Sequence, residues 1–221
     1  MKIIRFFAVL GLGIFMTGCA ANMALVKGQD SVDLSDKSIA LVSVKISNKN
    51  KPGYQPRLLY AFFFADSEGA EKTHIDVKNE PQKSEPNQYN EYLLSFSLKP
   101  GTYNFSAIWA GYNIPLLLNA MCVIPLSYKV EVKPNSIIYL GHIDATIRER
   151  KNETEERAGG VIPLIDQAMA GFSSGTFDVL INDNFDEDIK VYLTEYPVLK
   201  KHKIIKAILP NWIRPENIAK K

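Results

Sequence analysis

Short runs of β-branched and aromatic residues, separated by turn residues, recur from residue 38 to residue 182 and constrain the fold of this chain most. Residues 38–46 alternate toward their end, 58–65 are continuously apolar, and 91–98 alternate again. Runs of this kind, bounded by Gly, Pro and Asn clusters, predict β-strands. The other expected strands span residues 73–78, 103–109, 128–133, 136–148 and 177–181, with residues 79–90 expected as a long loop.

About seven or eight such strands favour an antiparallel β-sandwich, and residues 38–182 are expected to form this domain. Pro100 and Gly101 join the runs 91–98 and 103–109. A Pro-Gly turn in this position predicts that the two strands form a hairpin. No glycine-rich phosphate loop follows an expected strand, which argues against a nucleotide-binding α/β fold.

The turn from Leu98 to Tyr103, with the sequence L-K-P-G-T-Y, is similar to one found in many extracellular β-sandwich modules. These include transthyretin-like and carboxypeptidase regulatory-like domains. The similarity covers six residues. It supports a mainly β fold, an Ig-like or transthyretin-like antiparallel sandwich, and it implies no activity.

Residues 183–221 are expected to form a C-terminal helical extension, because the apolar residues change to helical spacing there. Asn184 lies three residues before Glu187, which is a capping-box arrangement. Pro197 ends this first helix, and a second short helix is expected from Val198 to Leu209.

The acidic group at the start of the first helix also invites a calcium-binding interpretation. Its members are Asp183, Asp186, Glu187 and Asp188. The group lacks the glycine and the distal Glu of an EF-hand loop. Helix capping and a favourable interaction with the helix dipole explain these residues with fewer assumptions.

The first 18 residues have the organisation of a signal peptide. Two cations precede the apolar stretch Phe6–Met16, which is shorter than the roughly 20 residues that a membrane-spanning helix needs. The stretch ends in Met16-Thr17-Gly18-Cys19, which resembles the lipobox of bacterial lipoproteins. Met16 stands where that family usually has Leu.

The resemblance implies that residues 1–18 are removed and that Cys19 carries a diacylglyceryl thioether and an acylated amine, which anchor the chain to a membrane. Residues 19–37 are then expected to be a lipidated tether. Ala20 stands where an Asp commonly retains such proteins at the inner membrane. The expected location is therefore the cell envelope, lipid-anchored at the outer membrane and facing the periplasm.

Removal of the signal peptide leaves a chain with no net charge. Without Lys2 and Arg5, 24 Lys and Arg balance 24 Asp and Glu, so the overall charge gives no case for nucleic acid as a partner. Cys122 is then the one cysteine left to the domain, which excludes an intramolecular disulfide. It lies in the apolar run 116–126 and is expected to be a buried thiol, the alternative being a reactive nucleophile.

Two His-x-Asp pairs are the candidate metal ligands: His74 with Asp76, and His142 with Asp144. Residues i and i+2 of a strand share one face, so each pair can project together. If the two strands were neighbours, four ligands could converge on a zinc ion. The alternative is two solvent-facing polar pairs on an outer sheet surface.

The end of the chain is rich in cations, with seven Lys and Arg against one Glu from residue 200 to residue 221. The candidate surface residues are Lys200, Lys201, Lys203, Lys206, Trp212 and Arg214. Basic and aromatic residues together suit an anionic membrane surface or an acidic partner. The alternative is an amphipathic helix packed on the sandwich with its lysines in water.

No G-x-S-x-G nucleophile motif occurs, and no cofactor is expected. The leading hypothesis is a non-catalytic sandwich, held at the membrane by its N-terminal lipid, that binds an envelope protein partner or supports an envelope assembly. The second is a metal-dependent or hydrolytic cell-wall enzyme that uses the His-x-Asp pairs. The third is a lipid- or saccharide-binding module that uses aromatic residues such as Trp109 and Tyr112.

Overall fold

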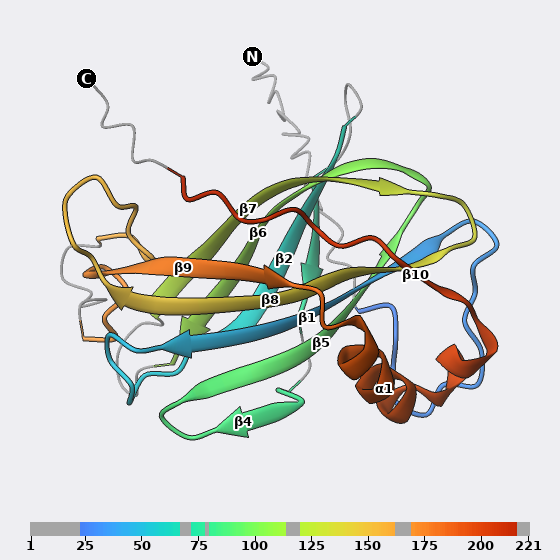
Figure 1. Ribbon diagram of the computed structural model, residues 1–221, viewed down its shortest axis with the longest axis horizontal. Helices are drawn as coiled ribbons and strands as arrows, with labels where there is room; N and C mark the ends of the chain where they lie inside the picture. The colour runs from blue at the N-terminus through green and yellow to red at the C-terminus, as the bar shows by residue number, and fades with distance from the viewer. Residues whose placement is uncertain (1–22, 67–71, 78–79, 114–119, 162–168, 216–221) are drawn as a thin grey trace, which may run out of the picture.

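Two β-sheets pack face to face in the computed structural model, which describes residues 23–66, 72–77, 80–113, 120–161 and 169–215 (Figure 1). The six-stranded sheet consists of β1 (Ser38–Asn48), β4 (Lys83–Glu85), β5 (Tyr89–Leu98), β8 (Ile137–Glu149), β9 (Gly175–Asn182) and β10 (Ile204–Lys206). The four-stranded sheet consists of β2 (Arg57–Ala65), β3 (Lys72–Asp76), β6 (Gly101–Tyr112) and β7 (Ala120–Val132).

The strand order confirms the mainly β sandwich that the sequence predicts. In the described part of the chain the six-stranded sheet has the order β10-β8-β1-β5-β4, with β9 also beside β8, and the other sheet has the order β3-β2-β6-β7. Most neighbouring strands are antiparallel, while β1 and β10 both run parallel to β8. The long strand expected at 136–148 is β8, and that expected at 177–181 is β9.

Alternating apolar residues form the core between the sheets. On β5, Tyr92, Leu94 and Phe96 are buried together in this core, as their alternation predicts. Phe63 of β2 stacks on Phe105 of β6 with 4.3 Å between ring centroids. The burial of these apolar side chains is the main force that holds such a sandwich together.

The Pro100-Gly101 turn does not form the expected hairpin. β5 belongs to the six-stranded sheet and β6 to the four-stranded sheet, so the turn carries the chain from one sheet to the other. β6 pairs with β2 and β7 instead. Each of the two strands has one apolar face, and placing them in opposite sheets buries both faces in the shared core.

Two other expectations from the sequence are corrected. The strand expected at 128–133 is the second half of β7, which already begins at Ala120. Its first half did not show alternation, because outward-facing positions such as Met121 and Val123 are apolar as well. The loop expected at 79–90 contains β4, a short strand that pairs with β5.

The C-terminal extension begins with the expected helix and then departs from expectation. α1 (Phe185–Glu195) is followed by a short 3₁₀ helix, η1 (Pro197–Lys201). Asn184 precedes α1, but its side chain makes no capping hydrogen bond. The second helix expected over Val198–Leu209 is wrong, because the chain after η1 becomes extended and β10 pairs with β8. Consecutive β-branched isoleucines in β10 favour a strand.

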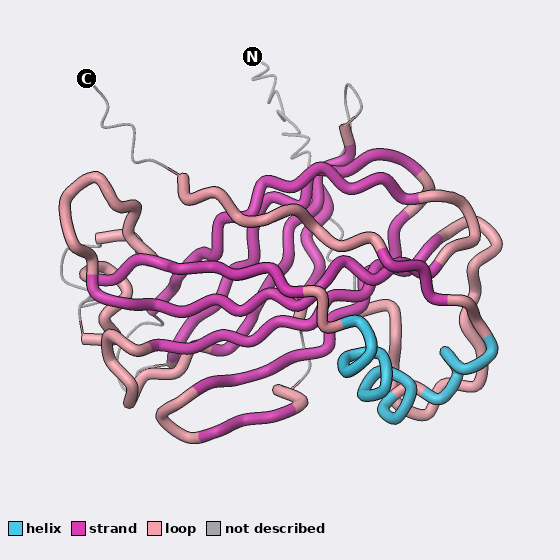
Figure 2. The backbone as a smooth tube through the Cα atoms, in the orientation of Figure 1, coloured by secondary structure: helices cyan, strands magenta, loops and turns pink. Residues whose placement is uncertain are grey.

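The two helical elements cover one end of the outer face of the six-stranded sheet (Figure 2). Tyr192 of α1 is fully buried, and its hydroxyl lies 2.9 Å from the Val42 carbonyl oxygen and 2.8 Å from that of Leu94. The six-stranded sheet is therefore buried on both faces at this end. No helix in the described residues has both the length and the apolar character needed to cross a bilayer.

The described part of the expected tether, residues 23–37, is attached to the domain at its start. Met23 and Leu25 are buried. The Ala24 amide donates to the Ser95 carbonyl oxygen and the Leu25 amide to the Ser95 hydroxyl, each at 2.9 Å. Because β4 covers only the start of β5, this segment covers the edge that β5 leaves open. The sequence Met16–Cys19, which resembles a lipobox, lies outside the described residues.

An extended segment, residues 207–214, runs along the side of the sandwich opposite to the β5 edge, and we call it the strap (red in Figure 1). Backbone hydrogen bonds connect its start to β8. The Trp212 indole Nε1 donates to the Pro125 carbonyl on β7 at 2.7 Å, and the Arg214 guanidinium pairs with Asp178 on β9. The strap thus joins the edges of the two sheets.

Candidate functional site

Four rings form a continuous aromatic surface on the outer face of the four-stranded sheet. Tyr60 and Phe62 lie on β2, His74 on β3 and Trp109 on β6, and we call this set the aromatic platform. Alternate residues of a strand share one face. In the strand register, His74 is opposite Phe62, and Trp109 is opposite Tyr60. The platform therefore results from the pairing of three strands.

The rings of the platform contact one another. The Phe62 ring lies 5.5 Å from that of Trp109 and 6.0 Å from that of His74, measured between centroids. The Tyr60 and His74 rings are 5.9 Å apart. These separations are typical of packed aromatic pairs. Trp109 remains 38% exposed, so the platform presents ring surface to solvent.

His74 and Asp76 place polar atoms beside these rings. His74 Nε2 lies 3.9 Å from Asp76 Oδ1, and the side chains are 31% and 18% exposed. Asp76 is opposite Tyr60 in the pairing of β2 with β3. A carboxylate and an imidazole next to ring faces suit a ligand that has both apolar faces and hydroxyl groups.

Of the two aromatic residues singled out from the sequence, Trp109 alone belongs to the platform. Tyr112 packs edge-on against Tyr54, with 5.2 Å between ring centroids. Tyr60 and Phe62 lie in a continuously apolar run, which indicates a central strand and gives no sign of an exposed aromatic face. β2 is such a strand, between β3 and β6, but one of its faces is not covered by a second layer of described chain.

The two His-x-Asp pairs do not converge on a metal. His74 lies in the four-stranded sheet and His142 in the six-stranded sheet, so their strands are not neighbours. Among the described residues there is no group of three or more side chains placed to hold a metal ion. The solvent-facing alternative is also wrong for His142, which is buried and meets Asp188 of α1.

Asp188 is the centre of a buried polar network beneath α1. The Tyr139 hydroxyl donates to its Oδ2 at 2.5 Å, and His142 Nδ1 lies 3.1 Å from the same oxygen. Burial alone raises the pKa of Asp188, but hydrogen bonds from His142 and Tyr139 outweigh it and lower the pKa. Burial alone lowers the pKa of His142, and Asp188 outweighs it, so this pKa is raised.

The burial of Asp188 in this network shows that it is not a capping residue exposed at the helix start, as the sequence predicted. The buried side chains of the network also leave no access for a substrate. Asp188 faces the sheet and is buried, whereas Asp186 and Glu187 are exposed in the first turn of α1. Ser43, the register partner of His142, is a serine near a His-Asp pair, but it is completely buried. The arrangement therefore fixes α1 to the sheet and does not present a nucleophile.

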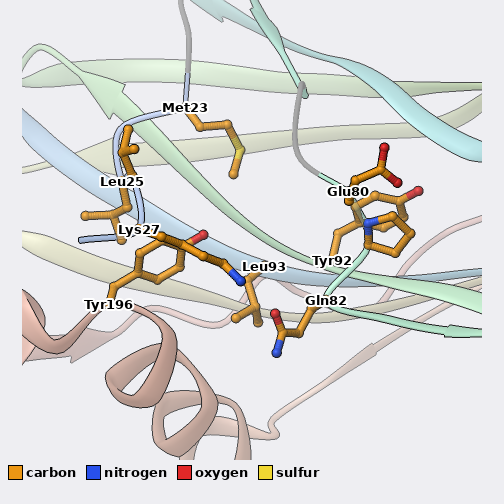
Figure 3. Close-up of a pocket in the computed structure, with 10 residues that line it drawn as sticks. Met23, Leu25, Lys27, Glu80, Gln82, Tyr92, Leu93 and Tyr196 are labelled. Atoms are coloured by element: carbon orange, nitrogen blue, oxygen red, sulfur yellow. The ribbon is translucent and has the colours of Figure 1, made fainter. Parts of the chain in front are cut away.

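A half-open cavity of about 490 Å³ lies where the N-terminal segment meets β5, and we call it the edge pocket (Figure 3). Its apolar walls are formed by Met23, Leu25, Val26, Pro81, Leu93 and the rings of Tyr92 and Tyr196. Three polar residues complete the lining, Lys27, Glu80 and Gln82. No local pattern in the sequence indicates this pocket, because its walls come from four separate segments.

The polar residues of the edge pocket are already paired. Lys27 Nζ lies 2.5 Å from a carboxylate oxygen of Glu195, and Gln82 donates to the other oxygen at 2.9 Å. Glu80 lies 3.3 Å from the Arg57 guanidinium. The charges around the pocket therefore compensate one another.

The structure divides the basic residues of the C-terminus into two sets. Lys206 contacts Asp183 at 2.8 Å and Arg214 pairs with Asp178, so both hold the extension to the domain together with the Trp212 contact of the strap. The packing is that of an extended chain and not of the expected helix. The cations of the second set, at and after the end of η1, are exposed: Lys200, Lys201 and Lys203.

Comparison with known proteins gave no relative. No family model matches this chain, and neither does any curated protein or solved structure. A function is therefore inferred from the residues and their geometry.

Proposed function

We propose that this protein is a lipid-anchored component of the cell envelope whose β-sandwich binds saccharides non-catalytically through the aromatic platform. The resemblance of Met16–Cys19 to a lipobox supports the anchor. The platform supports the binding role, because it gathers Tyr60, Phe62 and Trp109 on a face that no second layer of described chain covers. This exposed aromatic surface is the observation that carries the proposal.

Saccharide recognition needs the two kinds of contact that the platform offers. A sugar ring has an apolar face of C–H groups, which packs on an aromatic ring, and hydroxyls at its rim, which need hydrogen-bond partners. The Asp76 carboxylate can accept from such hydroxyls, and His74 can donate or accept according to its tautomer. Because the platform spreads over three neighbouring strands, it suits an extended glycan better than a single small sugar.

An anionic membrane surface fits the platform less well. Such surfaces attract clusters of Lys and Arg. Asp76 places a carboxylate beside the rings, next to His74, and a carboxylate is repelled by anionic head groups. The saccharide is therefore the ligand class we adopt.

Binding to cell-wall glycan tests the proposal. Purified Cys19→Ser protein, which cannot be lipidated, should co-sediment with insoluble peptidoglycan. Trp109→Ala should weaken this binding about tenfold, the loss expected for one well-packed ring. Leu180→Ala is the matched control, because Leu180 is 63% exposed on β9 of the other sheet and should bind like the parent.

Two results would overturn the saccharide assignment. One is equal sedimentation of Trp109→Ala and the parent protein. The other is binding to anionic phospholipid vesicles with none to glycan, which would identify the platform as a membrane-binding surface. The anchor has a separate test: Cys19→Ser should shift the protein from the membrane fraction to the soluble fraction of the cell envelope.

A further inference from the structure

We infer that the edge pocket binds one acyl chain of a monoacyl amphiphile taken from the membrane beside the anchor. This is a second site, distinct from the aromatic platform, and it rests on the proposed lipid attachment at Cys19. The ligand class follows from the size of the pocket, the character of its walls, its charge balance and its position.

The walls of the pocket match a hydrocarbon chain. Leu25 and Leu93 contribute aliphatic side chains, and Tyr92 and Tyr196 contribute ring bodies. A cavity of about 490 Å³ lies within the usual range for small-ligand sites. Each methylene moved from water into such walls favours binding, because its apolar surface is removed from water.

The charge balance of the pocket favours an amphiphile without a charged head. Lys27 is satisfied by Glu195, and Glu80 by Arg57. A ligand carboxylate would have to displace Glu195 from Lys27 or stand beside two acidic residues. A head group bearing hydroxyls, such as glycerol, avoids this conflict and can remain at the solvent side.

The position of the pocket brings it to the membrane. Met23 lines the pocket and is four residues from Cys19. Four residues span at most about 14 Å when fully extended. The segment that follows Met23 is bound to Ser95 on β5, so it does not increase the distance between Cys19 and the domain. A lipid on Cys19 therefore holds this side of the domain against the bilayer, where monoacyl amphiphiles are found.

Calorimetric titration of the Cys19→Ser protein with 1-monolauroylglycerol, below its micelle concentration, tests the inference. We expect saturable binding of one molecule per chain. Val26→Asp places a carboxylate on the lining at a position that is 64% exposed, so folding is preserved while affinity falls about tenfold. Leu180→Asp, at 63% exposure on β9, is the matched control and should bind like the parent.

The alternatives give different results. Absence of saturable binding, or equal affinity of Val26→Asp and the parent, contradicts the inference. Binding by Cys19→Ser but none by the lipidated protein shows that the protein's own acyl chain fills the pocket, which also overturns it. Tighter binding of laurate than of monolauroylglycerol contradicts the uncharged head group. Trp109→Ala should keep full acyl binding, so a failed glycan experiment and a failed acyl experiment are distinguishable.

Discussion

His142 on β8 and Asp188 on α1 meet beneath the helix, with 3.1 Å between Nδ1 and Oδ2, although 46 residues separate them in the chain. Both side chains are about 9% exposed. Tyr139, three residues before His142, completes the pairing by donating to the same carboxylate. The contact connects the helical extension to the sheet through charge and hydrogen bonding, beside the apolar cluster around Tyr192.

Removal of the carboxylate should therefore destabilise the fold strongly. Asp188→Ala leaves His142 and Tyr139 buried without their shared partner, and we expect the free energy of unfolding to fall by about 3 kcal/mol. Urea denaturation followed by circular dichroism measures this change in the free energy of unfolding. Asp186→Ala, an exposed acid in the same helical turn, should change the stability by less than about 0.5 kcal/mol. Equal losses in the two variants would show that the network contributes nothing specific.

The same pair predicts how stability depends on pH. The pKa of His142 is raised in the folded state, so its contribution is complete below the unfolded value of about 6.5 and is lost as pH rises through the folded pKa. The pKa of Asp188 is lowered, so its contribution is present above the unfolded value of about 3.9 and is lost as pH falls through the folded pKa.

We therefore expect the urea midpoint to be highest between about pH 4 and pH 6.5 and to decrease toward pH 8.5. His142→Gln removes the titrating imidazole, so most of the decrease above pH 6.5 should disappear in this variant. The measurement is a series of urea denaturations of both proteins between pH 5 and pH 8.5. An unchanged slope in His142→Gln would assign the pH dependence to other groups.

The fold was largely predictable because strand periodicity is a local signal. The alternation at Tyr92, Leu94 and Phe96 and the β-branched and aromatic run at the start of β8 each indicate a strand without knowledge of the rest of the chain. The Pro100-Gly101 turn shows the limit of prediction from such local signals. Its residues specify a reversal of direction, but whether the next strand pairs with β5 or crosses to the other sheet depends on which partners compete for its edges.

The candidate sites were less predictable because each is assembled from separate strands. Nothing in the sequence relates Trp109 to Phe62 or His74, and β2 places them together only because it pairs with both β3 and β6. Asp188 looked like an ordinary acid of a first helical turn, although its spacing from Tyr192 puts both on the buried side of α1. The i, i+4 spacing of Asp188 and Tyr192 was the one feature of the sequence that indicated the burial of Asp188.

Cys122 provides a chemical test of the core. The residue is completely buried on β7, and burial raises the pKa of its thiol, so little thiolate is present and no reagent reaches it. In the Cys19→Ser protein, Ellman's reagent should react with no thiol under native conditions and with one per chain in urea. Rapid reaction of the native protein would contradict burial in the sandwich and support the alternative of a reactive cysteine.

The strap predicts a difference between two neighbouring residues. Trp212 is half-buried and hydrogen-bonded to Pro125, whereas Ile213 is 86% exposed. Trp212→Ala removes ring packing at the side of the sandwich and leaves a carbonyl without its donor, so we expect a loss of about 2 kcal/mol, less than for a fully buried Trp. Ile213→Ala should change stability by less than about 0.5 kcal/mol. Urea denaturation compares the two variants. If Trp212→Ala is as stable as Ile213→Ala, the strap does not join the sheets, and Trp212 becomes free to act in surface binding with the exposed lysines near η1.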